Sequence, residues 1–154
     1  MKGSTLLPKI ALRGFTPRTY GGGDVAKKKV IRDLLLKKIE DLPEVQSKCR
    51  GKTLSLDVSF YLYGKSSLEG RASKDLDNLL KIVLDALPDY MDKNKTERGL
   101  GLIEEDYDHL TFELHATKQL VSAEEYEGVD LEVFEWLEEN FFPEQTQFPN
   151  TNPA

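Results

Sequence analysis

The residues best suited to chemistry are charged side chains at the start of one predicted helix, in the stretch SKDLDNLLKIVLDAL (73–87). Asp77 and Lys81 are four residues apart, so they share one face of a helix. Asp75 lies near the helix N-terminus, where backbone N–H groups and the helix dipole favour an anion. Two interpretations are open. The three side chains are either a capping residue and a surface ion pair worth about 0.3–0.5 kcal/mol, or one half of a metal-dependent active site.

A second acidic group precedes a predicted strand further along the chain. The stretch GLIEEDYDHL contains Glu104, Glu105, Asp106 and Asp108. If this strand lies beside the start of the helix, three or more carboxylates converge, and without a cation each pair would repel by roughly 4 kcal/mol at about 4 Å. A hard divalent cation relieves this repulsion, and Mg²⁺ binds a few carboxylates together with phosphate. Acidic residues before a strand are equally consistent with a solvated turn.

These two stretches resemble the RusA-type crossover-junction endodeoxyribonucleases, which are Holliday junction resolvases. The shared pattern is an Asp-Leu-Asp-Asn helix start with a lysine four residues after the second Asp, an Asp-Ala-Leu helix end, and acids before a strand that ends in lysine. DLDNLLKIVLDAL and LIEEDYDHLTFELHATK match it within 73–118. The resemblance implies a Mg²⁺-dependent endodeoxyribonuclease that acts as a homodimer on branched DNA, in recombination and repair. It implies Asp75 and Asp77 as metal ligands and Lys81 as the contact to the scissile phosphate.

The third metal ligand stays open between two residues. The family has two adjacent Asp residues where this chain has EDYD (105–108). Alignment on Lys118, which closes the strand, selects Asp108, whereas alignment on Leu110, the first apolar residue of the strand, selects Asp106. We favour Asp108 as the third catalytic carboxylate and metal ligand, with Asp106 as the alternative.

Charge is distributed unevenly along the chain. The net charge is −6, yet residues 1–98 carry 20 Lys and Arg against 13 Asp and Glu, a net of +7, while residues 99–154 carry a net of −13. This asymmetry predicts a basic working surface with an acidic appendage, although two solvated faces of opposite sign would give the same composition. The candidate DNA contacts are cations of the basic part: Arg18, Lys27, Lys28, Arg32, Arg71 and Lys74.

Composition sets the broad class. With 39% apolar and 31% charged residues, the chain has the composition of a soluble globular protein, and no apolar run approaches the ~20 residues that cross a membrane. The N-terminus lacks the apolar core of a secretion signal, and the single cysteine, Cys49, can form no internal disulfide. We therefore expect a cytoplasmic protein without a membrane partner. No Gly-Lys-Ser/Thr follows the three glycines at 21–23, so no nucleotide cofactor is expected.

Hydrophobic spacing predicts the elements that hold these residues. Strict alternation predicts strands at 53–63 and 109–117, and helical spacing predicts the helix of 73–87 and a basic helix capped by Asp24. The remaining elements are a weaker strand at 4–14, whose Pro8 belongs at a sheet edge, and an acidic amphipathic helix at 129–142.

The expected fold is a single α/β (α+β) domain, a small mixed sheet with helices packed against it, RusA-like. We assign the domain to 1–142, with the acidic helix 129–142 as an appendage, and a mobile tail to 143–154. The irregular third carboxylate leaves one alternative function, a non-catalytic DNA-junction or protein-binding module with the same fold. The acidic C-terminal part would then dock a basic partner or cover the DNA-binding face.

Overall fold

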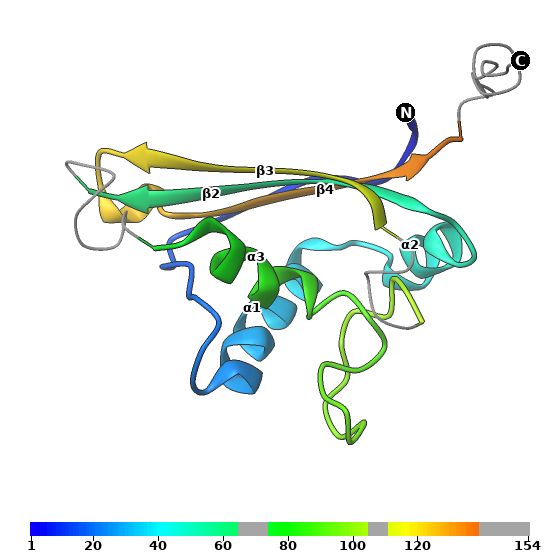
Figure 1. Ribbon diagram of the computed structural model, residues 1–154, viewed down its shortest axis with the longest axis horizontal. Coiled ribbons are helices and arrows are strands. Elements are labelled where there is room, and N and C mark those ends of the chain that lie inside the picture. Colours follow the sequence, from blue (N-terminus) through cyan, green and yellow to red (C-terminus); the bar gives the residue numbers. More distant parts are fainter. Residues whose placement is uncertain (65–73, 105–110, 139–154) are drawn as a thin grey trace, which may run out of the picture.

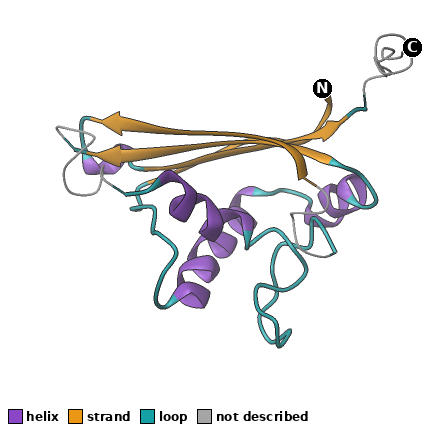
Figure 2. Ribbon diagram, viewed as in Figure 1, coloured by secondary structure: helices purple, strands orange, loops and turns teal. Residues whose placement is uncertain are grey.

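The computed structural model describes residues 1–64, 74–104 and 111–138 (Figure 1). In chain order the elements are β1 (Lys2–Arg13), α1 (Asp24–Lys38), α2 (Leu42–Cys49), β2 (Leu54–Tyr63), α3 (Leu76–Leu84), β3 (Thr111–Val121), the 3-10 turn η2 (Glu124–Tyr126) and β4 (Gly128–Trp136). They form one small α+β domain, a four-stranded mixed sheet with three helices packed against it. Figure 2 shows all three helices on the same face of the sheet.

The strand order is β1-β4-β2-β3. β2 and β3 pair in parallel, whereas β4 runs antiparallel to both β1 and β2. Parallel neighbours need a crossover connection, and here it contains α3, which lies under the sheet (Figure 1). The order makes β1 an edge strand, as the proline predicts: Pro8 falls in the irregular register between Leu7 and Ile10.

The predictions for β2 and α3 are confirmed. The alternating apolar residues of β2 are at most 1% exposed: Leu54, Leu56, Val58, Phe60 and Leu62. The apolar stripe of α3 covers them from below, with Leu79, Ile82 and Val83 also at most 1% exposed. Burial of this two-layer core holds the start of α3 against the sheet. None of the helices in the described ranges has the length and apolar composition of a membrane span.

The predicted acidic helix at 129–142 is wrong for the part that the structure describes. Residues 128–136 form β4, and they lie in the middle of the sheet, not in an appendage. Val129, Leu131 and Val133 are at most 1% exposed, which is the period-two pattern of a strand. Helical spacing also fits this segment, but pairing with β1 and β2 on both sides decides the outcome. Residues 139–142 and the predicted tail 143–154 lie outside the described residues.

The basic segment forms two helices where one was predicted, and its cap differs. Asp24 is the first residue of α1 rather than its cap, and its Oδ1 accepts a hydrogen bond from the backbone N–H of Gly21 at 2.7 Å. The capping position is Gly23, which has φ 67°, a left-handed conformation that favours glycine. The second helix, α2, starts after Asp41, whose Oδ1 accepts from the N–H of Glu44 at 3.2 Å.

The predicted strand at 109–117 is β3, which the structure describes from Thr111. It is the second edge strand of the sheet. Leu114 and Leu120 are 40% and 44% exposed, because the helices cover the middle of the sheet more fully than this edge. The alternating pattern therefore predicted a strand correctly, but Leu114 and Leu120 on its apolar side are only partly buried.

Candidate functional site

The two acidic residues at the start of α3, Asp75 and Asp77, are exposed. Asp75 occupies the capping position, with φ −69° and ψ 131°, but its side chain makes no capping hydrogen bond. Asp77 accepts a hydrogen bond from the N–H of its own neighbour, Asn78, at 3.0 Å. It forms no ion pair with Lys81 or with any other residue in the described ranges. The predicted ion pair between Asp77 and Lys81 is therefore wrong, whereas Asp75 is the N-cap residue by position but makes no capping hydrogen bond with its side chain.

Lys81 lies over an aromatic ring instead of a carboxylate. Its Nζ is 5.0 Å from the centroid of Tyr20, within the range of a cation–π contact. Tyr20 itself is held against α3, because its backbone N–H donates to the carbonyl oxygen of Asn78 at 2.9 Å. Sequence reasoning missed Tyr20. The available signal was an aromatic residue between Arg18 and the three glycines.

Contacts from two other parts of the chain hold the start of α3. Lys74 Nζ donates to the carbonyl oxygen of Pro17 at 2.7 Å, which joins this start to the segment before α1. Lys118 Nζ, from β3, donates to the carbonyl oxygen of Lys74 at 2.9 Å. Lys118, which sequence reasoning used only to align the strand, therefore joins the edge of the sheet to the helix start.

A buried carboxylate holds the segment that carries Pro17 and Tyr20. Glu127 is 1% exposed, and its Oε1 accepts from the hydroxyl of Thr16 at 3.0 Å. Its Oε2 accepts from the N–H of Tyr63 at 3.0 Å. A buried carboxylate is stable only when such partners satisfy it, so Glu127 is a positioning residue of the fold. Sequence reasoning did not identify it, because the stretch AEEYEG (123–128) reads as solvent-exposed.

Three of the predicted DNA contacts are engaged within the protein. Lys27 Nζ donates to the carbonyl oxygen of Thr19 at 2.6 Å. Lys28 is 8% exposed and lies 3.0 Å from the carboxylate of Asp85. Lys74 donates to Pro17, as described above. These cations organise the segment 14–28 around the start of α3, whereas Arg18 is exposed and Arg71 lies outside the described residues.

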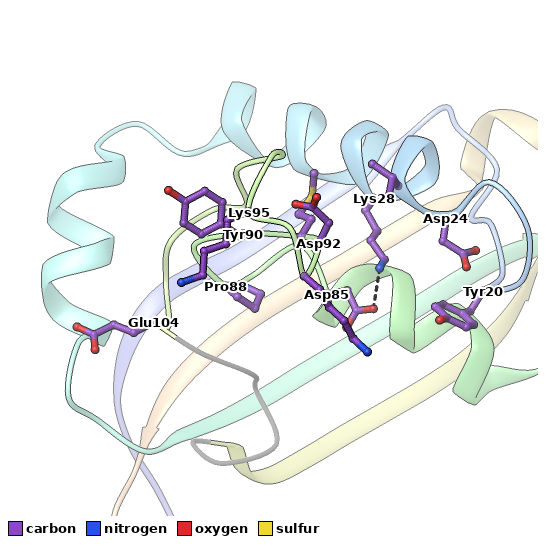
Figure 3. A pocket seen from close by; sticks show the side chains of 12 residues that line it. Tyr20, Asp24, Lys28, Asp85, Pro88, Tyr90, Asp92, Lys95 and Glu104 are labelled. Carbon is purple, nitrogen blue, oxygen red and sulfur yellow. Dashed lines mark ion pairs between the residues drawn. The ribbon is translucent and has the colours of Figure 1, made fainter.

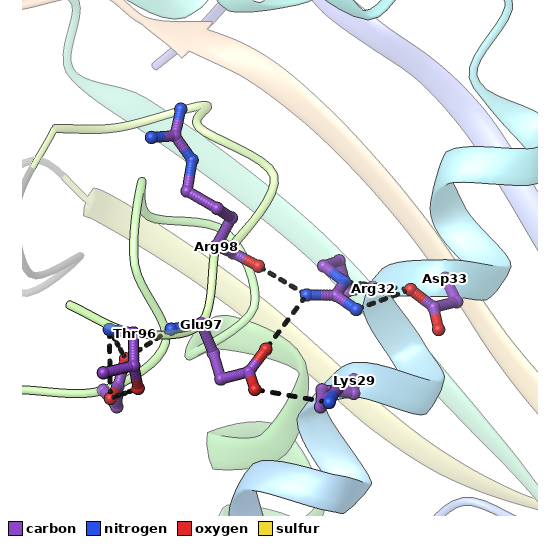
Figure 4. A network of polar contacts seen from close by, with 7 residues as sticks. Lys29, Arg32, Asp33, Thr96, Glu97 and Arg98 are labelled. Atoms are coloured by element: carbon purple, nitrogen blue, oxygen red, sulfur yellow. Dashed lines mark hydrogen bonds and ion pairs between the residues drawn. The ribbon is translucent and has the colours of Figure 1, made fainter.

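Arg32, a fourth predicted contact, joins α1 to the segment that follows α3 (Figure 4). Its guanidinium donates to the carbonyl oxygen of Arg98 at 2.8 Å and lies 2.9 Å from Asp33 and 3.8 Å from Glu97. Lys29 contacts the same Glu97 at 3.3 Å. Glu97 therefore neutralises part of the positive charge of α1.

The predicted third ligands, Asp106 and Asp108, lie outside the described residues. Within the described ranges, no three His, Cys, Asp or Glu side chains are grouped as a metal site. Thr111, which follows the acidic stretch, pairs with Leu54 at the beginning of β2. Lys118, which contacts the start of α3, is seven residues further along β3, about 23 Å at ~3.3 Å per residue. The start of β3 and the start of α3 are thus at different positions along the sheet.

Glu104, the last described residue before that stretch, is paired with a residue outside α3. Its carboxylate lies 3.2 Å from the guanidinium of Arg50, which follows α2. Arg50 also contacts Asp89 at 2.7 Å. Glu104 is therefore paired near α2, and the described acidic group at the start of α3 consists of Asp75 and Asp77.

Comparison with known protein families, with curated proteins and with solved structures finds no match. The protein is a small α+β domain in which Asp75 and Asp77, at the start of α3, and Lys81, in its last turn, are exposed.

Proposed function

We propose that this protein is a Mg²⁺-dependent endodeoxyribonuclease of the RusA type, which hydrolyses phosphodiesters in branched DNA such as four-way Holliday junctions, in recombination and repair. One observation carries the proposal: Asp75 and Asp77 are exposed, and among the described residues neither carboxylate forms an ion pair and the Asp75 side chain makes no capping hydrogen bond. Carboxylates with a structural role would have such partners. Their unpaired state fits side chains that bind a ligand from solution.

The donor chemistry of this position fits Mg²⁺. Carboxylate oxygens are the ligands that this cation prefers, and it is usually held by one or two of them together with substrate phosphates. Asp75 and Asp77 would hold it, with Asp108 or Asp106 as the proposed third ligand. When bound, Mg²⁺ lowers the pKa of its bound water and offsets the negative charge that develops on the phosphate.

The protein's own residues would bind and orient the substrate. Lys81 is exposed and unpaired with any described carboxylate, so its ammonium is available to a phosphate oxygen on the same helix face as Asp77. The contacts of Lys74 and Lys118 hold the helix start rigid, which keeps the reacting groups in one geometry. Arg18 is the exposed cation closest in sequence to Tyr20, and it would bind a flanking phosphate, giving salt-dependent affinity.

The symmetry of the proposed substrate favours a homodimer. A four-way junction has two equivalent strands to cut, and a two-fold homodimer would supply two equivalent sites. We therefore propose a homodimer as the active form. Sedimentation of the protein with and without a synthetic junction tests this, and a complex containing one protein chain per junction would contradict it.

The proposal is tested by incubating synthetic four-way junctions with the protein in Mg²⁺. We expect nicking near the branch point, and we expect Asp75→Asn and Asp77→Asn each to reduce the rate at least ~100-fold while junction binding is retained. Asp41→Asn, which changes an exposed helix cap far from this position in sequence, is the matched control and should cut normally. Equal cutting by the wild type and both α3 variants would refute the assignment of the site.

A specific observation favours the alternative function, a non-catalytic DNA-junction or protein-binding module. The start of β3 pairs with the beginning of β2, about 23 Å along the strand from the residue that contacts α3,. A third carboxylate next to Asp75 is therefore not supplied by the described residues. Junction binding without nicking in either Mg²⁺ or Mn²⁺ would select this alternative.

A further inference from the structure

A groove lies beside Tyr20, between α1, the end of α3 and the segment that follows α3 (Figure 3). Its volume is about 640 Å³, within the range of roughly 300–1,000 Å³ that is typical of sites for small ligands. Tyr20 lies at one end and Glu104 at the other, as Figure 3 shows. Val25, Pro88 and Met91 supply apolar walls. The groove is therefore large enough for one nucleotide and has an aromatic end.

The aromatic end is held in place before any ligand binds. Two ammonium groups lie over the ring of Tyr20, Lys28 Nζ at 5.7 Å and Lys81 Nζ at 5.0 Å from its centroid. The backbone on both sides of Tyr20 accepts hydrogen bonds from Lys27 Nζ, at the carbonyl oxygens of Thr19 and Gly21. Tyr20 as a residue is still 42% exposed. The exposed part of a planar ring that is held in this way offers a stacking surface to a nucleic-acid base.

The groups on the groove that lack an ion partner among the described residues are two lysines and one carboxylate. Three of its four acidic residues are ion-paired: Asp24 with Lys27 at 3.7 Å, Asp85 with Lys28 at 3.0 Å, and Glu104 with Arg50 at 3.2 Å. The fourth, Asp92, accepts hydrogen bonds from the hydroxyl of Thr96 and the N–H of Glu97 and keeps its negative charge. Lys93 and Lys95 are exposed on the groove and form no ion pair with a described residue. With Lys81 beside Tyr20, the groove offers an aromatic surface and free ammonium groups to an anionic ligand.

We infer that this groove binds one unstacked nucleotide of the DNA substrate, with its base on the ring of Tyr20 and its phosphates near Lys93, Lys95 or Lys81. The inference rests on the proposed function, because it names the part of the substrate that this surface recognises. A base at an opened branch point has lost a stacking neighbour, so it costs least to turn outward. Stacking on an aromatic ring replaces the interaction it has lost, and the ring accepts any of the four bases.

The test is photo-cross-linking with four-way junctions that carry 5-iodouracil at single positions around the branch point. The junctions are bound in EDTA, so that the readout does not depend on cleavage, then irradiated, and the cross-linked peptide is identified by mass spectrometry. We expect at least one position to cross-link to Tyr20. Affinity is measured in parallel for Tyr20→Leu, which removes the ring, and for Tyr20→Phe, which keeps the ring. Tyr126→Leu changes an exposed tyrosine, 52% accessible and outside the groove, as the control.

Tyr20→Leu should weaken junction binding roughly tenfold, as expected for the loss of one base–aromatic stack, and should abolish the cross-link at that position. Tyr20→Phe and Tyr126→Leu should bind like the wild type. If junctions are bound and nicked but every cross-link maps outside the groove, this inference fails and the proposed function stands. If the protein neither binds nor nicks junctions, both fail.

Discussion

Carboxylates in two regions of this molecule differ in burial and in hydrogen bonding. Around β4, Asp130 and Glu127 are buried and satisfied: Asp130 accepts from Arg13 at 2.8 Å and from the hydroxyl of Tyr61 at 2.9 Å. At the start of α3, Asp75 and Asp77 are exposed, and among residues 1–64, 74–104 and 111–138 neither has a cation or hydroxyl partner of this kind. A buried charge is tolerated only with partners, whereas an exposed one needs none. Acidic residues of the first kind stabilise the fold, and those of the second kind are available to a ligand.

The largest change in the free energy of unfolding is expected for a substitution in β4, because the apolar residues of this acidic strand are part of the core. Leu131→Ala removes a side chain that is 1% exposed and should lower the free energy of unfolding by about 3 kcal/mol. Urea denaturation measures this. Leu137→Ala, at a residue 38% exposed just beyond the strand, is the control and should cost less than ~1 kcal/mol. Equal losses for the two variants would mean that β4 is not buried in solution.

The same substitution, Asp to Asn, should change the free energy of unfolding differently in the two regions. Asp130→Asn removes the negative charge that Arg13 and Tyr61 contact and should cost about 2 kcal/mol, since hydrogen bonds to charged groups contribute ~1.5–3 kcal/mol. Asp75→Asn removes a charge that caps nothing, so its effect should stay within ~0.5 kcal/mol of zero. Both values come from urea denaturation without divalent cations. A loss of 2 kcal/mol or more for Asp75→Asn would show a structural role for that residue.

The smallest effect on stability is expected at Glu113, a carboxylate that accepts a hydrogen bond but is only half-buried. The Ser55 hydroxyl donates to Glu113 Oε1 at 2.6 Å, and this hydrogen bond holds the pKa of Glu113 below its ordinary value of 4.5. Because the folded pKa lies below the unfolded one, the stabilisation is present above about pH 4.5 and is lost as pH falls through the lowered pKa.

Ser55→Ala should therefore move the pKa of Glu113 upward, toward 4.5, as followed by NMR titration of its side-chain carbonyl carbon. The neighbouring His115 lowers the same pKa to a smaller degree, so the return is expected to be incomplete. A pKa that does not change in Ser55→Ala would show that another group controls Glu113.

The elements that the sequence predicted well are those with one unambiguous period. β2 alternates over its whole length and α3 carries a continuous apolar stripe, and both lie where these patterns require. β4 was predicted as a helix because its apolar residues fit both helical spacing and the period of two of a strand. Its glutamates suggested a solvated helix, and the contacts that admit charge into the sheet come from β1 and β2, which are remote in sequence. No local pattern carries that information.

The candidate site was predictable in part for the same reason. Asp75, Asp77 and Lys81 were proposed as site residues from spacing within one helix, which is local. The ring of Tyr20 reaches Lys81 through a segment that lies about 60 residues earlier and is shaped by three glycines with positive φ. The engagement of Lys28 and Arg32 by acids after α3 likewise depends on tertiary contacts. Charge counting alone therefore overstated how much of α1 is free to bind DNA.

The acids at the start of α3 are proposed to bind a divalent cation, and a Mg²⁺ titration of the thermal unfolding midpoint tests this proposal. A ligand that binds only the folded state raises stability by RT ln(1 + [L]/Kd), about 1.4 kcal/mol at tenfold Kd. We predict that millimolar Mg²⁺ raises the midpoint of the wild type and of Asp41→Asn but not that of Asp75→Asn. A wild-type midpoint that does not respond to Mg²⁺, or an Asp75→Asn variant that responds equally, would contradict Mg²⁺ binding at the start of α3.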